Sequence, residues 1–277
     1  MLEMRLVDEI ILNALKEDMP MGDITTDNII GNDEQSKAKF IAKEDGIIAG
    51  IDVAKRVFIL LDETVKFTFE RADGEAVSKG DIMLEFEGNT RALLKAERTA
   101  LNLIQRMSGI ATRTNNFCKL VEGTSAKIVD TRKTSPGLRY LEKYAVRAGG
   151  GQNHRYCLSD GVLIKDNHIK AAGGIKNAVA KVRNSIPHTI KIEVETENFE
   201  MVSEALDAGA DIIMLDNMTA QQMAQAVGMI DHKALVEASG DIDEEKVLET
   251  AKTGVDIISI GRITHSVKAM DISMRFI

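Results

Sequence analysis

The sequence is poor in cysteine and in aromatic residues. It has two Cys, three Tyr and no Trp. Cys118 and Cys157 form no CxxC pair and no histidine cluster surrounds them, so nothing supports a zinc site. A disulfide is not expected in a reducing compartment, and we predict that both thiols are small buried side chains. The scarcity of aromatic rings argues against a stacking platform for single-stranded nucleic acid.

Long apolar runs and an excess of positive charge are also missing. No run approaches the roughly 18 to 20 apolar residues of a membrane helix, so no membrane association is expected. The chain reaches Asp8 and Glu9 before the apolar core of a signal peptide could form, which favours a cytoplasmic protein. Lys and Arg number 35 against 43 Asp and Glu, and this net charge of −8 speaks against a nucleic-acid partner.

The remaining composition is that of an ordinary folded protein. The 277 residues are 44% hydrophobic and 28% charged, which excludes a disordered chain and a collagen-like repeat. At roughly 150 residues per domain, this length predicts two domains, or one α/β barrel with an addition.

The first part of the chain predicts a helix followed by a small β-rich domain. Apolar residues recur at helical spacing over residues 4–16. Between about 37 and 88, short β-type runs alternate with Asp-Gly and Gly-Asp turns, a pattern typical of a mixed, mostly antiparallel sheet. A long helical pattern over residues 91–121 then leads into a second region.

The second region repeats a strand and a helix. Helical patterns over 199–208 and 244–253 each end in a glycine, the expected cap before a buried strand. Such units predict a parallel sheet covered by helices, and the lack of an opening Gly-x-Gly-x-x-Gly favours barrel-like closure over an open sheet. The predicted strands are 127–130, 162–165, 190–194, 211–215, 234–237 and 255–259.

Polar residues end each of these predicted strands. In a parallel α/β barrel, the active site lies at the carboxyl ends of the strands. A single terminal acid is usually a helix cap or a surface charge, but six polar ends in succession predict a functional site. The six ends are Asp130 to Lys133, Lys165 to His168, Glu195, Asp216 with Asn217, Glu237 to Gly240, and Ser259 to Arg262.

Positive charge is concentrated in residues 131–170, although the chain as a whole is negative. Eight Lys or Arg stand there against three acids, a local charge of +5. Arg132, Lys133 and Lys165 adjoin apolar strands, and cations gathered there need an anionic ligand to offset their desolvation. Arginine pairs with carboxylate or phosphate through two hydrogen bonds, and lysine acts as a point charge. We therefore predict a ligand with several negative groups.

Two carboxylates and two glycine-containing strand ends complete the predicted site. Glu195 and Asp216, on neighbouring strands, suit a polyanion if Mg²⁺ lies between them, because Mg²⁺ favours one or two carboxylates together with phosphate oxygens. Ser239-Gly240 and Gly261 end the next two strands, where barrels often bind phosphate through backbone N–H groups.

Three long motifs resemble the quinolinate phosphoribosyltransferase family. They are Asp130-Thr-Arg-Lys-Thr-Ser-Pro-Gly137, Gly149-Gly-Gly-Gln-Asn-His-Arg155, and the run from Leu158 to His168. The resemblance extends nearly end to end, from Glu17-Asp-Met-Pro-Met-Gly to Ile260-Gly-Arg-Ile-Thr-His. It implies an N-terminal α+β open-faced sandwich domain over residues 1–106, joined by 266–277. It also implies an incomplete α/β barrel of fewer than eight strands over 107–265.

The same resemblance implies a reaction and its partners. Quinolinate and phosphoribosyl pyrophosphate would give nicotinate mononucleotide, pyrophosphate and CO₂, with Mg²⁺ as cofactor, in de novo NAD biosynthesis. It further implies a two-fold homodimer, with a hexamer left open. In that dimer, Arg98 would enter the quinolinate pocket of the neighbouring subunit.

Site residues of the family are carried over by motif. Lys133, Glu195 and Asp216 would be catalytic, and the two carboxylates would bind Mg²⁺ directly or indirectly. The residues that would bind substrate are Arg98, Thr131, Arg132, Lys133, His154, Arg155, Lys165, Glu195, Asp216, Ser239, Gly240, Asp241, Ile260, Gly261 and Arg262.

Two positions depart from the family's pattern at the phosphate end. Asp241 follows Gly240 where another glycine is common, and Arg262 follows Gly261 where a small residue is more usual. An acid would repel phosphate unless its side chain points away, and we predict that Arg262 either adds a phosphate contact or offsets the charge of Asp241. Two alternatives stay open: a relative from molybdenum-transport operons that acts on another anion, and a non-catalytic anion-binding protein.

Overall fold

The computed structural model describes residues 2–277 and divides the chain into two compact units. The first comprises the chain up to Asn115 together with Thr134–Gly150 and Ile263–Ile277. The second comprises Asn116–Lys133 and Gly151–Arg262. Nothing in the sequence pattern indicated that residues 134–150 return to the first unit.

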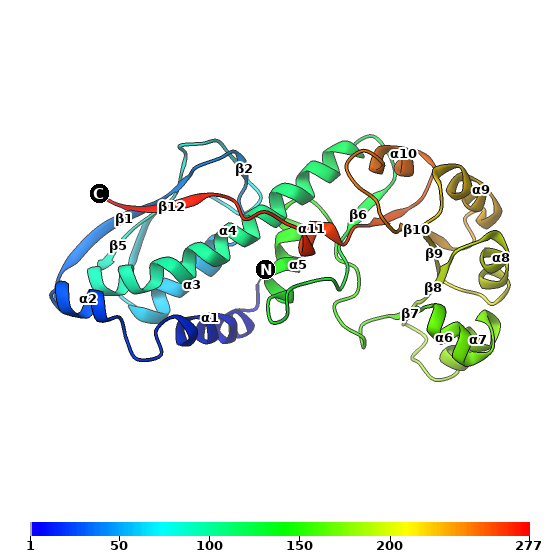
Figure 1. Ribbon diagram of the computed structural model, residues 1–277, viewed down its shortest axis with the longest axis horizontal. Coiled ribbons are helices and arrows are strands. Elements are labelled where there is room, and N and C mark those ends of the chain that lie inside the picture. The colour runs from blue at the N-terminus through cyan, green and yellow to red at the C-terminus, as the bar shows by residue number, and fades with distance from the viewer. Residues whose placement is uncertain (1) are drawn as a thin grey trace. The chain divides into compact units, whose positions relative to one another are not determined.

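The first unit combines a small sheet with several helices, one of them long (Figure 1). Helix α4 confirms the helix predicted over 91–121, and α1 confirms the one predicted over 4–16. Its helices are α1 (Met4–Asp18), α2 (Ile24–Ile29), α3 (Ile51–Leu61), α4 (Thr90–Leu120, whose residues after Asn115 belong to the second unit) and α5 (Arg139–Ala148). Its strands are β1 (Gln35–Ala42), β2 (Gly46–Ile47), β3 (Lys66–Glu70), β4 (Ala76–Val77), β5 (Ile82–Asn89) and β12 (Ile272–Phe276).

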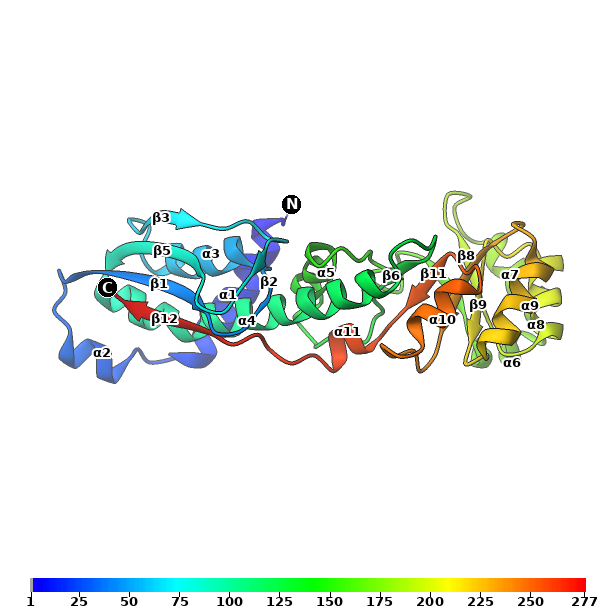
Figure 2. The same cartoon turned by 90° about the horizontal axis from the view of Figure 1, so that it is seen from above.

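The main sheet of this unit is antiparallel, in the order β12-β1-β5-β3. Side chains alternate along β1, so Ala38, Phe40 and Ala42 share one face and are buried. The rings of Phe40, Phe58 and Phe86 pack with centroids 4.4 to 5.9 Å apart, and they form the centre of the core. Figure 2 shows α4 running beside this sheet.

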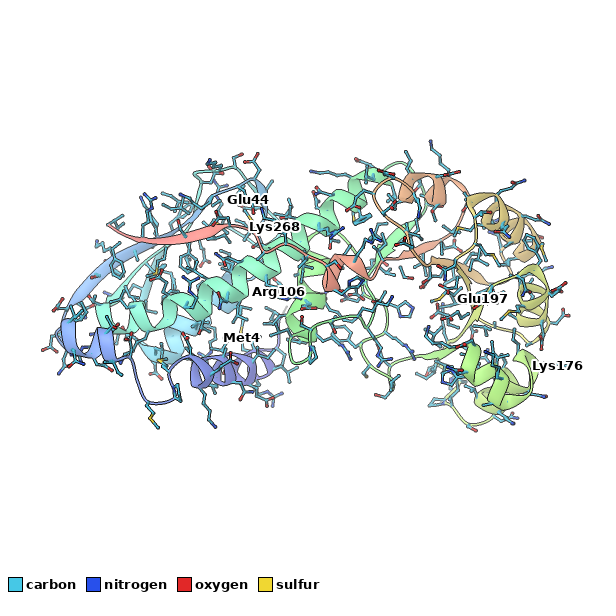
Figure 3. All side chains as sticks on the ribbon, in the orientation of Figure 1. Met4, Glu44, Arg106, Lys176, Glu197 and Lys268 are labelled. Carbon is cyan, nitrogen blue, oxygen red and sulfur yellow. The ribbon has the colours of Figure 1, made fainter. Side chains whose placement is uncertain are left out.

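Strand β12 reaches β1 through a segment fastened at several points. The carboxylate of Glu44 accepts hydrogen bonds from Lys268 Nζ at 2.9 Å and from the backbone N–H of Asp271 at 2.8 Å (Figure 3). The N–H of Met270 donates to the carbonyl of Gln105 at 2.9 Å. These bonds connect the last part of the described chain to the β1–β2 region and to α4.

The second unit repeats a strand and a helix, as the sequence predicts. After α8 and α10, Gly209 and Gly254 adopt positive φ angles of 75° and 91°, which confirms the predicted glycine caps. Its strands are β6 (Lys127–Val129), β7 (Val162–Ile164), β8 (Ile192–Thr196), β9 (Ile212–Asp216), β10 (Leu235–Ser239) and β11 (Ile257–Ser259). Its helices are α6 (Asp166–Ala172), α7 (Ile175–Arg183), α8 (Phe199–Asp207), α9 (Ala220–Ile230) and α10 (Val247–Lys252). The short α11 (Arg262–His265) follows β11, where the chain returns to the first unit.

All six strands of the second unit are parallel, in the order β6-β11-β10-β9-β8-β7. They are the six predicted strands, and they form the predicted incomplete barrel. Within the described residues, β6 and β7 are the edges of this sheet and the barrel is not closed. A single parallel bridge joins Val129 of β6 to Gln152, so the segment after Gly150 continues beyond this edge.

The two cysteines only partly match their prediction. Cys118 is half-buried, and burial raises the pKa of its thiol. Cys157 is exposed, so the prediction of a buried side chain is wrong for this residue. It lies in the bend after Arg155, and its Sγ lies 3.1 Å from the hydroxyl of Ser159. In residues 2–277, no helix has both the length and the apolar character needed to cross a membrane.

Candidate active site

The carboxyl ends of the parallel strands bring the predicted carboxylates and cations to one edge of the sheet. Asp216 and Ser239 are the last residues of β9 and β10 and lie opposite each other in the ladder. Glu195 lies near the end of β8, and Lys165 follows β7 directly. The Lys165 ammonium is paired with the Glu195 carboxylate across these neighbouring strands.

The loops after β9 and β10 touch at Gly240. Asn217 donates its backbone N–H to the carbonyl of Ser239 at 3.1 Å, and its side-chain amide donates to Asp216 at 2.8 Å. Gly240 has a φ of 122°, and a Cβ at this position would lie 2.5 Å from Asn217 Oδ1. Only glycine allows this approach, so the glycine predicted at the phosphate end is required by the backbone.

Asp241 and Arg262 form an ion pair at this end of the site. Lys246 also donates to the Asp241 carbonyl at 3.1 Å, and its Nζ lies 3.9 Å from the carboxylate. The pairing matches the prediction that Arg262 offsets the charge of Asp241. Ile260, another residue predicted to bind substrate, has a buried side chain, and its backbone N–H donates to the carbonyl of Val129. Gly261, which is also predicted at the phosphate end, is half-buried and directly precedes Arg262.

The segment that carries His154 is fixed to β6 by Asp130, which is fully buried. One Asp130 oxygen accepts the backbone N–H of His154 at 2.9 Å, and the other accepts the Asn153 amide at 2.6 Å. The N–H of Gln152 donates to the carbonyl of Ile128 at 2.9 Å. These hydrogen bonds to Asp130 and Ile128 hold the backbone around His154 in place.

Two buried glutamates contact the imidazole of His154. Nε2 lies 3.1 Å from Oε2 of Glu193 and 3.5 Å from Oε2 of Glu237. The two glutamates are only 3% and 1% exposed, and the Oε1 atom of each is buried without a hydrogen-bond partner. Burial alone would lower the pKa of His154, but the hydrogen bonds to the carboxylates outweigh it and raise the pKa to about 10. Burial also raises the pKa of Glu193.

The other ring nitrogen of His154 is also engaged. The backbone N–H of Arg155 donates to Nδ1 at 2.8 Å, which favours a lone pair on that nitrogen. The two carboxylates favour a doubly protonated ring instead. In either state, Nε2 carries a proton and faces the glutamates.

Arg155 and its neighbours form the cationic part of the site. Burial and the nearby Arg132 guanidinium lower the pKa of Arg155, whereas Glu193 opposes this shift. Arg155 Nη1 donates to the carbonyl of Gly161 at 2.8 Å. Thr131 accepts the N–H of Lys133 at 3.0 Å through its hydroxyl, and the side chains of Arg132 and Lys133 are exposed.

Arg98 is an exposed residue of α4 and belongs to the first compact unit. The other predicted site residues all belong to the second unit. Within that unit, the structure pairs Lys165 with Glu195 and Asp241 with Arg262, and it places Asp216 opposite Ser239.

The side chains predicted to bind Mg²⁺ offer the oxygen ligands that this ion prefers. Glu195 and Asp216 offer hard carboxylate oxygens at the ends of adjacent parallel strands. Each carboxylate has one neighbour that donates to it, Lys165 and Asn217 respectively, so each retains further acceptor capacity. The residues present therefore fit Mg²⁺ that is shared with an anionic ligand.

The sequence prediction missed Glu193, and it assigned no role to Glu237. Both precede by two residues a polar residue that the prediction did select, Glu195 and Ser239 respectively. Residues two apart share a face of a strand, so each glutamate lies one layer deeper on the same face. That spacing was the available signal, and the apolar neighbours Ile192 and Val194 obscured it.

Comparison with family models covers almost the whole chain. Residues 23–108 match the model described as the quinolinate phosphoribosyl transferase N-terminal domain. Residues 110–275 match the model of the corresponding C-terminal domain.

Relatives and solved structures of similar length agree with these matches. The chain is 47% identical over 258 residues to a probable nicotinate-nucleotide pyrophosphorylase (carboxylating) of Bacillus subtilis, covering 93% of this chain and 89% of that protein. It is 43% identical to the mitochondrial quinolinate phosphoribosyltransferase (decarboxylating) 2b of Nicotiana tabacum, covering 96% and 81%. The crystal structure of NadC from Streptococcus pyogenes superposes with a TM-score of 0.96 at 42% identity, covering 99% and 97%.

Proposed function

The chain belongs to the quinolinate phosphoribosyltransferase family, and we propose that it transfers phosphoribosyl from phosphoribosyl pyrophosphate to quinolinate with decarboxylation. The products are nicotinate mononucleotide, pyrophosphate and CO₂, which places the reaction in de novo NAD biosynthesis. The observation that carries this proposal is the Lys165–Glu195 ion pair at the ends of β7 and β8, next to Asp216 at the end of β9, in a chain matched almost throughout by the family.

The cations bind and orient quinolinate, a dianion. Arg132, Lys133, Arg155 and Lys165 supply charge at the strand ends, and arginine can pair with a carboxylate through two hydrogen bonds. Because the carboxylates of quinolinate are fixed on its ring, holding both of them also directs the ring nitrogen toward C1 of the ribose. Lys165 can exchange its present partner, Glu195, for a substrate carboxylate.

The carboxylates act on the ribose side. As the ring nitrogen bonds to C1, the bond between C1 and the pyrophosphate oxygen breaks, and positive charge develops on the sugar. Glu195 or Asp216 stabilises that charge from the strand ends. Mg²⁺, held by these two residues, would neutralise charge on the departing pyrophosphate.

Decarboxylation follows on the same substrate. The bond between C2 and its carboxylate breaks, its electron pair is accepted by the pyridinium, and C2 then takes up a proton. The substrate supplies its own electron sink, so this step requires no organic cofactor and no covalent enzyme intermediate.

The phosphate end uses Ser239, Gly240 and Gly261. Arg262 neutralises Asp241 there, which lets an acid stand beside a phosphate site. Replacing both residues together, Asp241→Gly with Arg262→Ala, is expected to change the KM for phosphoribosyl pyrophosphate. An unchanged KM would show that the pair has no part in phosphate binding.

The assembled enzyme is a cytoplasmic homodimer in this proposal. Arg98 has an exposed side chain on α4 and enters the quinolinate pocket of the partner subunit. A hexamer of such dimers is compatible with the same site. The negative net charge supports the absence of a nucleic-acid partner.

A single assay tests the proposal. Purified protein, Mg²⁺, phosphoribosyl pyrophosphate and quinolinate are combined, and nicotinate mononucleotide and CO₂ are followed together. Equal amounts of both products are expected. Binding of quinolinate without product would direct attention to Asp241, and no binding would favour the relative from molybdenum-transport operons that acts on another anion.

A further inference from the structure

The cluster of His154, Glu193 and Glu237 has more acceptors than its one ring proton can satisfy. Both carboxylates lie within 3.5 Å of the same Nε2, and each keeps a buried oxygen with no hydrogen-bond partner. Desolvating two carboxylates is costly, and packed apolar side chains in such strands often give a fold of equal or greater stability. Stability therefore does not explain the cluster.

The contacts around His154 instead fix the orientation of its ring. Nε2 is held from β8 and β10 by the two glutamates, and Nδ1 is held by the N–H of Arg155. Asp130 holds the backbone of the same residue from β6. Residues of two strands thus contact the ring, and Asp130, which follows β6, holds the backbone, so a turn of the ring would break these contacts.

The next residue in the chain is a cation of the proposed quinolinate pocket. The peptide of Arg155 is hydrogen-bonded to the His154 ring, and its guanidinium reaches Gly161 at 2.8 Å. A rotation of the imidazole would break the first of these bonds and release the Arg155 backbone. The position of the ring and the position of Arg155 are therefore coupled.

We propose that Glu193 and Glu237 are positioning residues for quinolinate binding. They hold the Nε2–H of His154 and, through that ring, keep His154 and Arg155 in the geometry that receives the dianion. The inference rests on the proposed function, because it uses the pocket assigned there to quinolinate.

The test uses Glu193→Gln, Glu237→Gln and the double variant in the full chain. Glutamine keeps the size and an oxygen acceptor but loses the charge that orients the ring N–H. In the double variant, we expect the dissociation constant for quinolinate, measured by calorimetry, to rise about tenfold or more, as for other displaced contact groups. The constant for phosphoribosyl pyrophosphate should stay within about twofold of the wild-type value.

Glu197→Gln is the matched control. This residue follows β8, its side chain is exposed, and its replacement removes one negative charge at the carboxyl end of the same strand (Figure 3). Quinolinate binding by this variant should equal that of the wild type. A rise as large as that in the double variant would overturn the inference, because any lost charge near β8 would then suffice.

Two other results would also overturn it. If the glutamates act only through their charge, their removal lessens the repulsion of a dianion, and quinolinate binds more tightly. If they serve only the fold, the double variant unfolds at a lower temperature but binds quinolinate with the wild-type constant.

A second measurement observes His154 directly and needs no turnover. In protein labelled with nitrogen-15 in histidine, the wild-type spectrum should show a slowly exchanging proton on Nε2 of His154, whether or not Nδ1 is also protonated, and the double variant should lose this protection. The resonance is assigned by its loss in His154→Gln. A His154 resonance in the double variant that equals that of the wild type would refute the positioning role.

The two proposals fail in different ways. If the proposed reaction is wrong, the wild-type protein forms no nicotinate mononucleotide, whatever the glutamine variants do. If only the positioning role is wrong, the wild type is active and the double variant binds quinolinate as well as the wild type does.

Discussion

Replacement of Gly240 by alanine tests whether the contact between the β9 and β10 loops shapes the phosphate end. The backbone φ of 122° is one that side chains rarely adopt, and such strain costs on the order of 1–3 kcal/mol. The new Cβ would also stand 2.5 Å from Asn217 Oδ1 and 3.0 Å from its backbone nitrogen. Ordinary contact begins at 3.4 Å, so Asn217 must shift, its Oδ1 by about 0.9 Å and its backbone nitrogen by about 0.4 Å.

A displacement of this size near the reacting groups costs between about tenfold and a hundredfold in rate. We therefore expect Gly240→Ala to lower kcat/KM for phosphoribosyl pyrophosphate by that factor and to leave the quinolinate dissociation constant near its wild-type value. Steady-state kinetics measures the first quantity and calorimetry the second.

Gly209→Ala is the control, because Gly209 also has a positive φ, of 75°, but no atom lies within 4 Å of its Cβ position. It has a positive φ without the collision and lies between α8 and β9, away from the carboxyl ends of the strands. If folded Gly240→Ala protein has the same kcat/KM for phosphoribosyl pyrophosphate as Gly209→Ala, the reasoning about the loop contact is refuted.

Three more predictions concern the dimer, the acid side of the pH range and the core. Arg98→Ala and Lys133→Ala should each be inactive, and subunit exchange between them should restore activity in some hybrid dimers; no rescue after confirmed exchange would contradict a shared site. Arg56 lowers the pKa of Asp8 through two hydrogen bonds of 2.7 and 2.8 Å. The pair therefore stabilises the fold above the ordinary pKa of Asp8, and this stabilisation is lost as the pH falls through the lowered pKa. Asp8→Asn should accordingly cost roughly 1 kcal/mol at pH 7 and less near pH 3 in calorimetric unfolding, and an equal cost at both would refute the pairing. Phe58→Ala should cost about 3–5 kcal/mol in the same measurement, because the ring is buried against Phe86, and a cost below 1 kcal/mol would mean that the core repacks.

The architecture could be predicted because its signals are local and repeated. Helical spacing and strand spacing identified α4 and all six parallel strands, and the polar strand ends located the cations and carboxylates. The predicted offset of Asp241 by Arg262 followed from charge alone, and the ion pair is present.

The other features could not be predicted, because they depend on which residues lie close together only in the folded chain. Glu193 stands between two apolar residues and looks like an isolated acid of a buried strand until the fold brings His154 to it. The return of residues 134–150 to the first unit has no local signature either. The prediction for Cys157 was wrong because composition gives an average burial for cysteine and does not identify a turn.

The pairing of β12 with β1 has a consequence for how the chain reaches its folded state. Strand β1 pairs on one side with β5, which is near in sequence, through Gln35 to Ile41, and on the other side with Ile272 to Phe276 through Ala38 to Ala42. During synthesis, β1 therefore presents an unpaired edge until the whole second unit has left the ribosome, and such edges invite pairing with other chains. The first unit begins to fold early but is completed last, so its maturation is limited by the slow closure of a very distant contact.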